Sequence, residues 1–224
     1  MSSISVAGDT SGSVTLQAPA VAGASVLTLP VATDTLVGKA TTDTLTNKTL
    51  TSPTISGAVV SAMGSSVLTS GTAVASTSGT SINFTSIPNW AKRITVMFNG
   101  VSTSGASQIL VQIGSGSVTT TGYLSYVGAT QSGSNGSTAF TTGFGVDCAT
   151  TTTNNVRYGH MVITSFGSNT YIESINIGDP NIGGGRSYTG GGSVTLSGFL
   201  DRVRITTVNG TDTFDAGSIN IMYE

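Results

Sequence analysis

Apolar residues recur at every second position after residue 80, and this period restricts the fold more than any other feature. Ile94, Val96 and Phe98 share one face of a strand, and Thr95 and Met97 share the other. Further strands are predicted at residues 82–87, 109–113, 123–127, 140–148, 156–163, 171–177, 194–196, 200–208 and 219–223. No segment has the 3.6-residue period of an amphipathic helix. About ten short strands predict an all-β fold with a jelly-roll-like antiparallel β-sandwich at residues 80–224.

The composition agrees with this prediction. Charged residues make up only 8% of the chain, whereas about 25% is usual in globular proteins. A disordered chain is rich in charge and poor in apolar side chains, but hydrophobic residues reach 38% here. Thr, Val and Ile favour strands, and the many Ser, Gly and Asn residues favour the turns between them. The chain is therefore expected to hold many strands and long polar loops.

Several classes of function and ligand are excluded at this point. Eight Lys and Arg residues and a net charge of −2 argue against binding nucleic acid through its phosphates. No run of about 18 apolar residues is present, so no membrane insertion is expected. The single Cys148 excludes an internal disulfide framework and a Cys-based zinc site, and no cofactor or metal is predicted. The first residues lack the basic and apolar regions of a signal peptide.

The N-terminal part, residues 1–60, has no sustained core pattern but contains a short repeat. Residues 33–41 align without a gap on residues 42–50, so that Asp, Leu and Lys recur nine residues apart. Repeats with so few apolar residues need neighbouring copies or chains to bury them. We expect an extended arm or stalk in which three chains pack together, with core residues Leu36, Leu45, Leu50 and Ile55. The alternative is a disordered polar arm. Residues 61–79, rich in Ser, Ala, Thr and Gly, are predicted to be a linker.

Five segments resemble proteins of tailed bacteriophage particles. Residues 42–55 (TDTLTNKTLTSPTI) resemble a motif that recurs in phage tail and fibre proteins, and residues 14–30 are similar to the N-terminal regions of these proteins. Residues 87–100 (IPNWAKRITVMFNG), together with 201–205 and 214–221, resemble the C-terminal domain of phage tail proteins. The resemblance implies a homotrimer located in the virion and assembled in the bacterial cytoplasm. It also implies that residues 1–60 attach to another virion protein.

Three functions remain open. The first is a structural tail fibre or spike whose C-terminal head contacts the host surface. The second is a head fibre or decoration protein that is anchored to the capsid by its N-terminal arm. The third, a glycan-cleaving spike, is disfavoured because the sequence offers little chemistry for it.

Candidate catalytic and metal-binding residues are few. A catalytic triad would depend on the single His160, for which a structural place on a strand is the simpler interpretation. Glycan hydrolysis would need two carboxylates placed across a sugar, such as Glu173 with Asp147 or Asp179, but nothing in the sequence pairs them. We therefore predict no catalytic residues and no enzyme. Residues 212–217 lack the ligand spacing of a calcium loop and are expected to form a turn.

Loops rich in Tyr, Ser, Gly and Asn are the better candidates for recognition, since this mixture resembles the composition of antibody loops. The main candidate is the glycine-rich stretch 181–192, predicted to be a loop that exposes Arg186 and Tyr188 to a host glycan. Tyr123, Tyr126 and Asn135, in the predicted loops 115–126 and 130–138, complete the set. The alternative is that these loops are solvated connectors. Trp90, beside a strand start, is expected to cover one end of the sandwich rather than to bind sugar.

Overall fold

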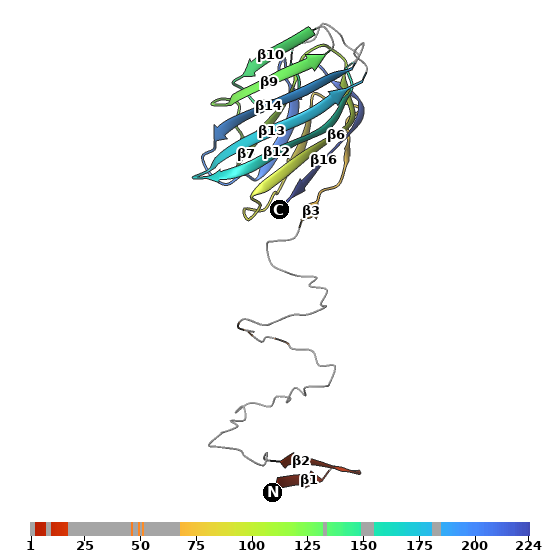
Figure 1. Cartoon of the computed structure of the whole chain (residues 1–224), viewed down its shortest axis with the longest axis vertical. Helices are drawn as coiled ribbons and strands as arrows, with labels where there is room; N and C mark the ends of the chain where they lie inside the picture. Colours follow the sequence, from red (N-terminus) through yellow and green to blue (C-terminus); the bar gives the residue numbers. More distant parts are fainter. Residues whose placement is uncertain are drawn as a thin grey trace. The chain divides into compact units, whose positions relative to one another are not determined.

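The structure, a computed structural model, describes residues 3–7, 10–17, 46, 49, 51, 68–131, 134–148, 155–180 and 185–224. It divides into two units, Met1–Ala58 and Val59–Glu224. In the first unit, β1 (Ser3–Ala7) and β2 (Ser13–Gln17) form an antiparallel hairpin (Figure 1). The predicted stalk residues Leu36, Leu45, Leu50 and Ile55 lie outside the described residues.

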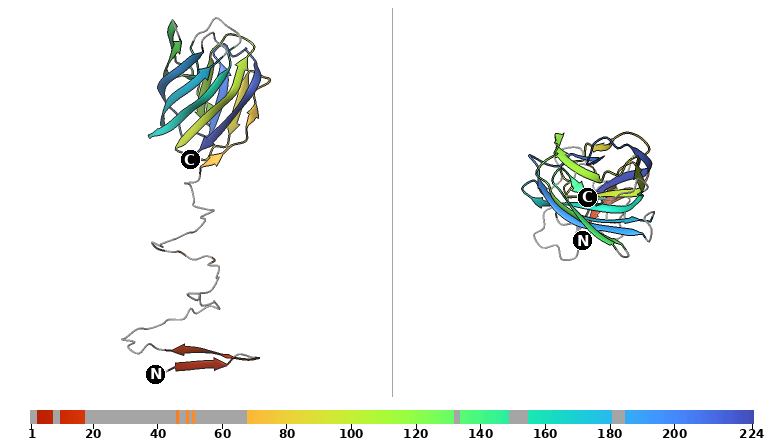
Figure 2. Two further views of the ribbon diagram at one scale, coloured as in Figure 1. Left: turned by 45° about the vertical axis from the view of Figure 1, so that its right-hand side comes forward. Right: turned by 90° about the horizontal axis from the view of Figure 1, so that it is seen from above.

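The second unit, called the head below, is a sandwich of two antiparallel sheets (Figures 1 and 2). The nine-stranded sheet runs in the order β10 (Ser134–Phe140), β9 (Leu124–Gln131), β14 (Arg186–Thr195), β13 (Thr170–Asp179), β12 (Arg157–Gly167), β6 (Arg93–Thr103), β16 (Phe214–Tyr223) and β3 (Thr69–Ser70), and β4 (Val74–Ala75) also pairs with β16. The five-stranded sheet has the order β11 (Phe144–Gly145), β7 (Ile109–Ser115), β15 (Arg202–Thr207) and β5 (Ser81–Thr85), with β8 (Ser117–Val118) beside β7. No helix occurs among the described residues.

The core lies between the two sheets and follows the alternation in the sequence. Ile94, Val96 and Phe98 of β6 are buried, whereas Thr95 and Met97 are only half-buried on the outer face. The same alternation places Met161 and Ile163 of β12 in the core and leaves His160 exposed. The predicted all-β, antiparallel sandwich is therefore confirmed. Its division into nine and five strands is less even than the two four-stranded halves of an eight-stranded jelly roll.

Some predicted loops are strands. Residues 69–70 and 74–75, predicted as linker, pair with β16, and most of the predicted loop 130–138 belongs to β10. The predicted loop 181–192 contains the first seven residues of β14, whose backbone pairs with β13 on one side and β9 on the other. These segments are short or rich in polar residues and glycine, so their backbones pair although the sequence shows no hydrophobic alternation there.

The head has two distinct ends. Thr69 pairs with Tyr223, and Ile94 lies opposite both Tyr223 and Ile163, so these positions mark one end, called the base. Figure 1 shows β3 and the C-terminus together there. The opposite, or far, end holds the last residues of β13 and β9 and the first residues of β12 and β14.

Asn99-Gly100, a dipeptide that is typical of hairpin turns, forms a bulge inside β6, where the registers with β12 and β16 both shift. Gly100 has a φ of 69°, and its carbonyl lies against Gly217 of β16, which has a φ of 87°. A Cβ atom at Gly217 would overlap the Gly100 carbonyl oxygen. The bulge therefore requires glycine at position 217 for its backbone conformation and for the close approach of the two strands.

We expect Gly217→Ala to lower the free energy of unfolding by about 2 kcal/mol or more beyond the effect of Gly116→Ala. Gly116 is the matched control because it also has a positive φ, 70°, but a Cβ atom there meets no atom within 4 Å. Urea unfolding of the two variants measures the difference. Equal destabilisation would show that the strand contact at Gly217 relaxes without cost.

Candidate functional site

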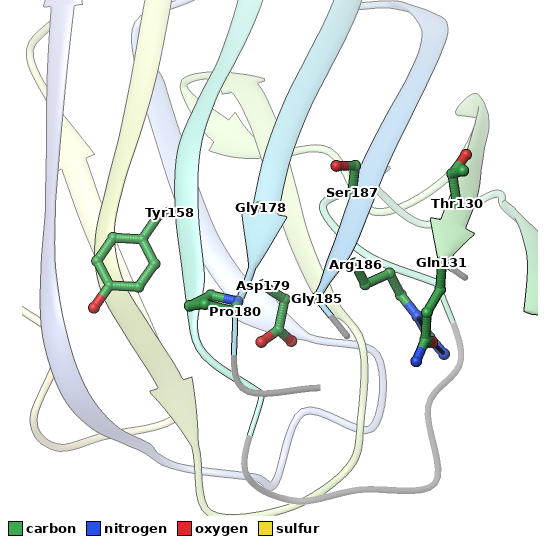
Figure 3. Close-up of a pocket in the computed structure, with 9 residues that line it drawn as sticks. All are labelled: Thr130, Gln131, Tyr158, Gly178, Asp179, Pro180, Gly185, Arg186 and Ser187. Atoms are coloured by element: carbon green, nitrogen blue, oxygen red, sulfur yellow. Dashed lines mark hydrogen bonds between the residues drawn. The ribbon is translucent and has the colours of Figure 1, made fainter. Parts of the chain in front are cut away.

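An open pocket of about 540 Å³ lies at the far end of the nine-stranded sheet. It is formed where β9 and β13 end and where β12 and β14 begin, and it is lined by Thr130, Gln131, Tyr158, Gly178, Asp179, Pro180, Gly185, Arg186 and Ser187. Figure 3 shows Tyr158 on one side, Arg186 and Gln131 on the other, and Asp179 with Pro180 between them. We call this the far-end pocket.

Arg186 is held in place by a neutral partner. Its Nε and Nη2 atoms donate hydrogen bonds of 2.9 and 2.5 Å to Oε1 of Gln131, the last residue of β9. Because an amide carries no charge, the guanidinium keeps its positive charge and has further N–H groups for other acceptors. Asp179 supplies a buried carboxylate whose Oδ1 accepts a hydrogen bond from the Val156 backbone at 3.2 Å. The pocket therefore combines a fixed cation, an anion and hydroxyl groups.

Tyr158 adds an aromatic surface to this pocket. It belongs to β12, and its side chain is 46% exposed on the outer face. An exposed aromatic ring offers a flat apolar surface, and its hydroxyl offers a hydrogen bond. Charged and hydroxyl groups arranged beside an aromatic ring suit the mixed apolar and polar surface of a saccharide.

A buried ion pair supports the far end from inside. The Arg157 Nε donates to Oδ2 of Asp147 at 2.7 Å, and its Nη2 contacts the same oxygen. Arg157 also donates through Nη1 to the Asn155 carbonyl at 3.0 Å, while the Ile109 backbone donates to the other Asp147 oxygen at 3.1 Å. Both charged side chains are almost fully buried. Removing one partner would leave an uncompensated buried charge, so this pair fixes β7 and β12 beside the pocket.

Two predicted recognition residues prove to be buried. Tyr188 is fully buried within β14, and its hydroxyl has no hydrogen-bond partner among the described residues. Burial raises the pKa of Tyr188 to about 12, and the nearby Asp147 adds to this effect while Arg186 opposes it. The prediction of Tyr188 at an exposed loop tip is therefore wrong, because β14 begins at Arg186 and alternation turns residue 188 inward.

Tyr123 is also a core residue rather than a receptor contact. Its hydroxyl accepts a hydrogen bond from the Ile113 backbone at 2.8 Å and lies 3.1 Å from the Thr119 carbonyl. Its ring packs edge-on against Phe144, with centroids 4.9 Å apart. Burial raises the pKa of Tyr123 to about 12.

The remaining predicted residues lie at different places. Asn135 is exposed on β10 and pairs in register with Thr130, beside the far-end pocket. Tyr126 is 55% exposed but lies near the base end of β9, where it lines a separate apolar hollow of about 300 Å³. Of the five residues, only Arg186 lines the far-end pocket. Tyr158 and Gln131 were not predicted as recognition residues, although the alternation in residues 156–162 places Tyr158 and His160 on one face of the strand.

Glu173 and Asp179 do not form a hydrolytic pair. Glu173 and Asp179 both lie on β13, six residues apart, which corresponds to about 20 Å along a strand. Glycosidases place their two carboxyl groups only about 5–10 Å apart. Glu173 is moreover buried in the core, where Ser125 donates to its Oε1 at 3.3 Å, and its Oε2 has no hydrogen-bond partner within the described part of the chain. These two residues therefore cannot act together across one glycosidic bond.

Other candidates have structural surroundings. Trp90 is partly buried against the core, and its ring lies 5.7 Å from that of Tyr223, in agreement with the predicted covering role. Asp212 accepts hydrogen bonds from the Ser107 backbone at 3.0 Å and from the Asn209 side chain at 2.7 Å. Within the described part of the chain, no group of three or more His, Cys, Asp or Glu side chains is placed to hold a metal ion.

Comparison with known proteins adds no assignment to this site. No family model, curated protein or solved structure matches the chain. The described residues also contain no helix that is long and apolar enough to cross a membrane.

We expect the buried Glu173 to make the stability of the head depend on pH. Desolvation raises the pKa of Glu173 from 4.5 to about 7, so the folded state binds its proton more tightly than the unfolded state. The contribution of Glu173 to the free energy of unfolding is fully present below pH 4.5 and is lost as the pH rises to about 7. The free energy of unfolding should decrease by about 3 kcal/mol across this range. Urea unfolding at pH values across this window measures the decrease.

Glu173→Gln keeps the shape of the protonated side chain and should remove this part of the pH dependence. Asp215→Asn, which changes an exposed carboxylate on β16, is the control and should leave it intact. A Glu173→Gln variant with the same pH profile as the unchanged protein would contradict the assignment.

Proposed function

We propose that this chain is a non-enzymatic structural protein of a tailed-bacteriophage particle, a tail fibre or spike whose head binds the host surface through the far-end pocket. The observation that carries the binding role is the arrangement of Arg186, Gln131, Asp179 and Tyr158 around one open hollow. This hollow lies at the opposite end of the head from β3, where the preceding chain joins the sandwich. A head attached through its base would present the pocket outward.

The phage assignment is supported by the resemblance of the sequence and by where its segments lie. Residues 87–100 and 214–221, although far apart in sequence, contribute to the neighbouring strands β6 and β16. The carbonyl of Glu224 accepts backbone hydrogen bonds from Lys92 at 2.7 Å and Arg93 at 3.0 Å. Two of the segments that resemble phage tail proteins thus lie side by side in the nine-stranded sheet.

We further propose that the protein is a homotrimer attached to the particle through residues 1–60. Support comes from the short repeat in that region and from apolar side chains on the outer face of the head. Leu124 and Ile172 are exposed near the base end, and both lie in register with Ser193. Burying such a row against another copy is favourable.

The mass of the full-length protein in solution tests the proposed trimer. Mass photometry is expected to give about three times the chain mass of 22.4 kDa. A monomer at micromolar concentration would contradict the trimer without bearing on the pocket.

Binding of the purified full-length protein to cells of the phage host tests the pocket. Tyr158→Ala and Arg186→Gln are expected to weaken binding about tenfold or more, because aromatic and Arg side chains commonly carry most of the binding free energy. The melting temperature should change little for Tyr158→Ala, whose side chain is exposed.

Tyr126→Ala is the matched control, since it removes an exposed tyrosine near the other end of β9. It should leave cell binding unchanged. Wild-type binding by both pocket variants, or an equal loss in the Tyr126 control, would remove the far-end pocket from the recognition surface.

A further inference from the structure

A second polar groove, of about 470 Å³, lies over the five-stranded sheet. It is bordered by Arg204 and Thr206 of β15, Gln112 of β7 and Ser81 of β5, and by Thr120 and Thr142 from the connecting segments. Arg204 lies in register between Gln112 and Asn83, so its side chain stands at the middle of the sheet rather than at an edge. No residue of the far-end pocket belongs to this groove.

The Arg204 guanidinium is fixed by two linked hydrogen bonds. Its Nε and Nη2 donate to Oε1 of Gln112 at 2.8 and 2.6 Å. The Gln112 side chain is in turn oriented by its Nε2, which donates to the Thr142 carbonyl at 2.7 Å, and the residue is only 4% exposed. A side chain that is held this way loses little conformational entropy when a ligand binds.

The charge of Arg204 is not balanced by a carboxylate. Three other arginines in the described part of the head have acidic partners: Asp147 for Arg157, Glu224 for Arg93, and Asp201 for the neighbouring Arg202, with Nε–Oδ1 at 2.7 Å. For Arg204, the described residues provide no ion pair, and no acidic side chain lines the groove. A half-buried cation beside a neutral amide contributes little to stability, because partial burial weakens its hydration and no opposing charge compensates for this loss.

We propose that this groove binds a saccharide that carries a carboxylate or phosphate group. Arg204 uses two of its five N–H groups on Gln112, so its remaining donors can form charge-assisted hydrogen bonds with an anionic oxygen. The hydroxyl groups of Ser81, Thr120 and Thr142 on the groove border suit the hydroxyls of the sugar ring. This proposal stands on the groove itself and does not depend on the phage assignment.

Titration of the ¹⁵N-labelled full-length protein, followed by amide chemical shifts, tests this proposal. Sodium glucuronate and glucose 6-phosphate are the charged sugar probes. Glucose, which lacks the anionic group, and inorganic phosphate, which lacks the sugar, are the two controls. We expect the amide chemical shifts of β7, β15 and residues 141–143 to change when either charged sugar is added. Glucose should bind at least about tenfold more weakly than the charged sugars. Arg204→Gln should weaken the charged sugars to the level of glucose, and Arg204→Lys should retain part of the affinity because it keeps the charge.

Arg202→Ala is the matched control, since it removes an outward arginine of the same strand that Asp201 already neutralises. This variant should bind the charged sugars with unchanged affinity. The melting temperatures of all three variants show whether a loss of binding is caused by a loss of folded protein. An equal loss in Arg202→Ala, or equal binding of glucose and glucuronate, would overturn the role of Arg204. Inorganic phosphate binding as tightly as glucose 6-phosphate would overturn the saccharide and leave a simple anion site.

Discussion

The pairing of β6 with β16 is the contact on which the rest of the head depends. It joins Arg93–Thr103 to Phe214–Tyr223, so the chain must close a loop of more than a hundred residues before these strands can meet. The closure costs conformational entropy, which the buried faces of the two strands and the hydrogen bonds at Glu224 offset. On one side of this pair, β12, β13 and β14 are neighbouring antiparallel strands, and the far-end pocket lies where β13 ends and β14 begins. On the other side, β3 and β4 both pair with β16.

The strands with buried, branched side chains could be predicted from the sequence, whereas those built from glycine could not. β6 and β7 show the alternation or the apolar run of buried strands, and both were predicted close to their observed places. β14 contains Gly190, Gly191 and Gly192, which in sequence indicate a loop. In the structure, a Cβ atom at Gly190 would overlap the Tyr126 carbonyl, so the close packing of β14 on β9 selects glycine within a strand. The misplaced Tyr188 follows directly from that error. Contacts such as Arg186 with Gln131, which are 55 residues apart, depend on strand order and have no local signal.

The far-end pocket and the groove over the five-stranded sheet both contain an arginine that is oriented by a glutamine, but they differ in charge. In each, an arginine donates through Nε and Nη2 to the oxygen of a glutamine on the neighbouring strand, Gln131 for Arg186 and Gln112 for Arg204. A neutral amide orients the guanidinium without cancelling its charge. The far-end pocket also contains the Asp179 carboxylate, so it favours a ligand without net charge, whereas the groove over the five-stranded sheet favours an anionic one. A head that used both would bind neutral and acidic sugars at two separate places, one on each sheet.

The central claim is that this chain is part of a phage tail and presents its head to the host. Immunogold electron microscopy of purified phage particles whose genome carries this sequence, with antibodies raised against residues 68–224, tests this proposal most directly. The account predicts a few gold particles at the tail of each virion and none on the capsid. Unlabelled virions, or gold distributed over the capsid, would contradict the tail assignment, and the second result would instead assign the protein to the head fibres or decoration of the shell.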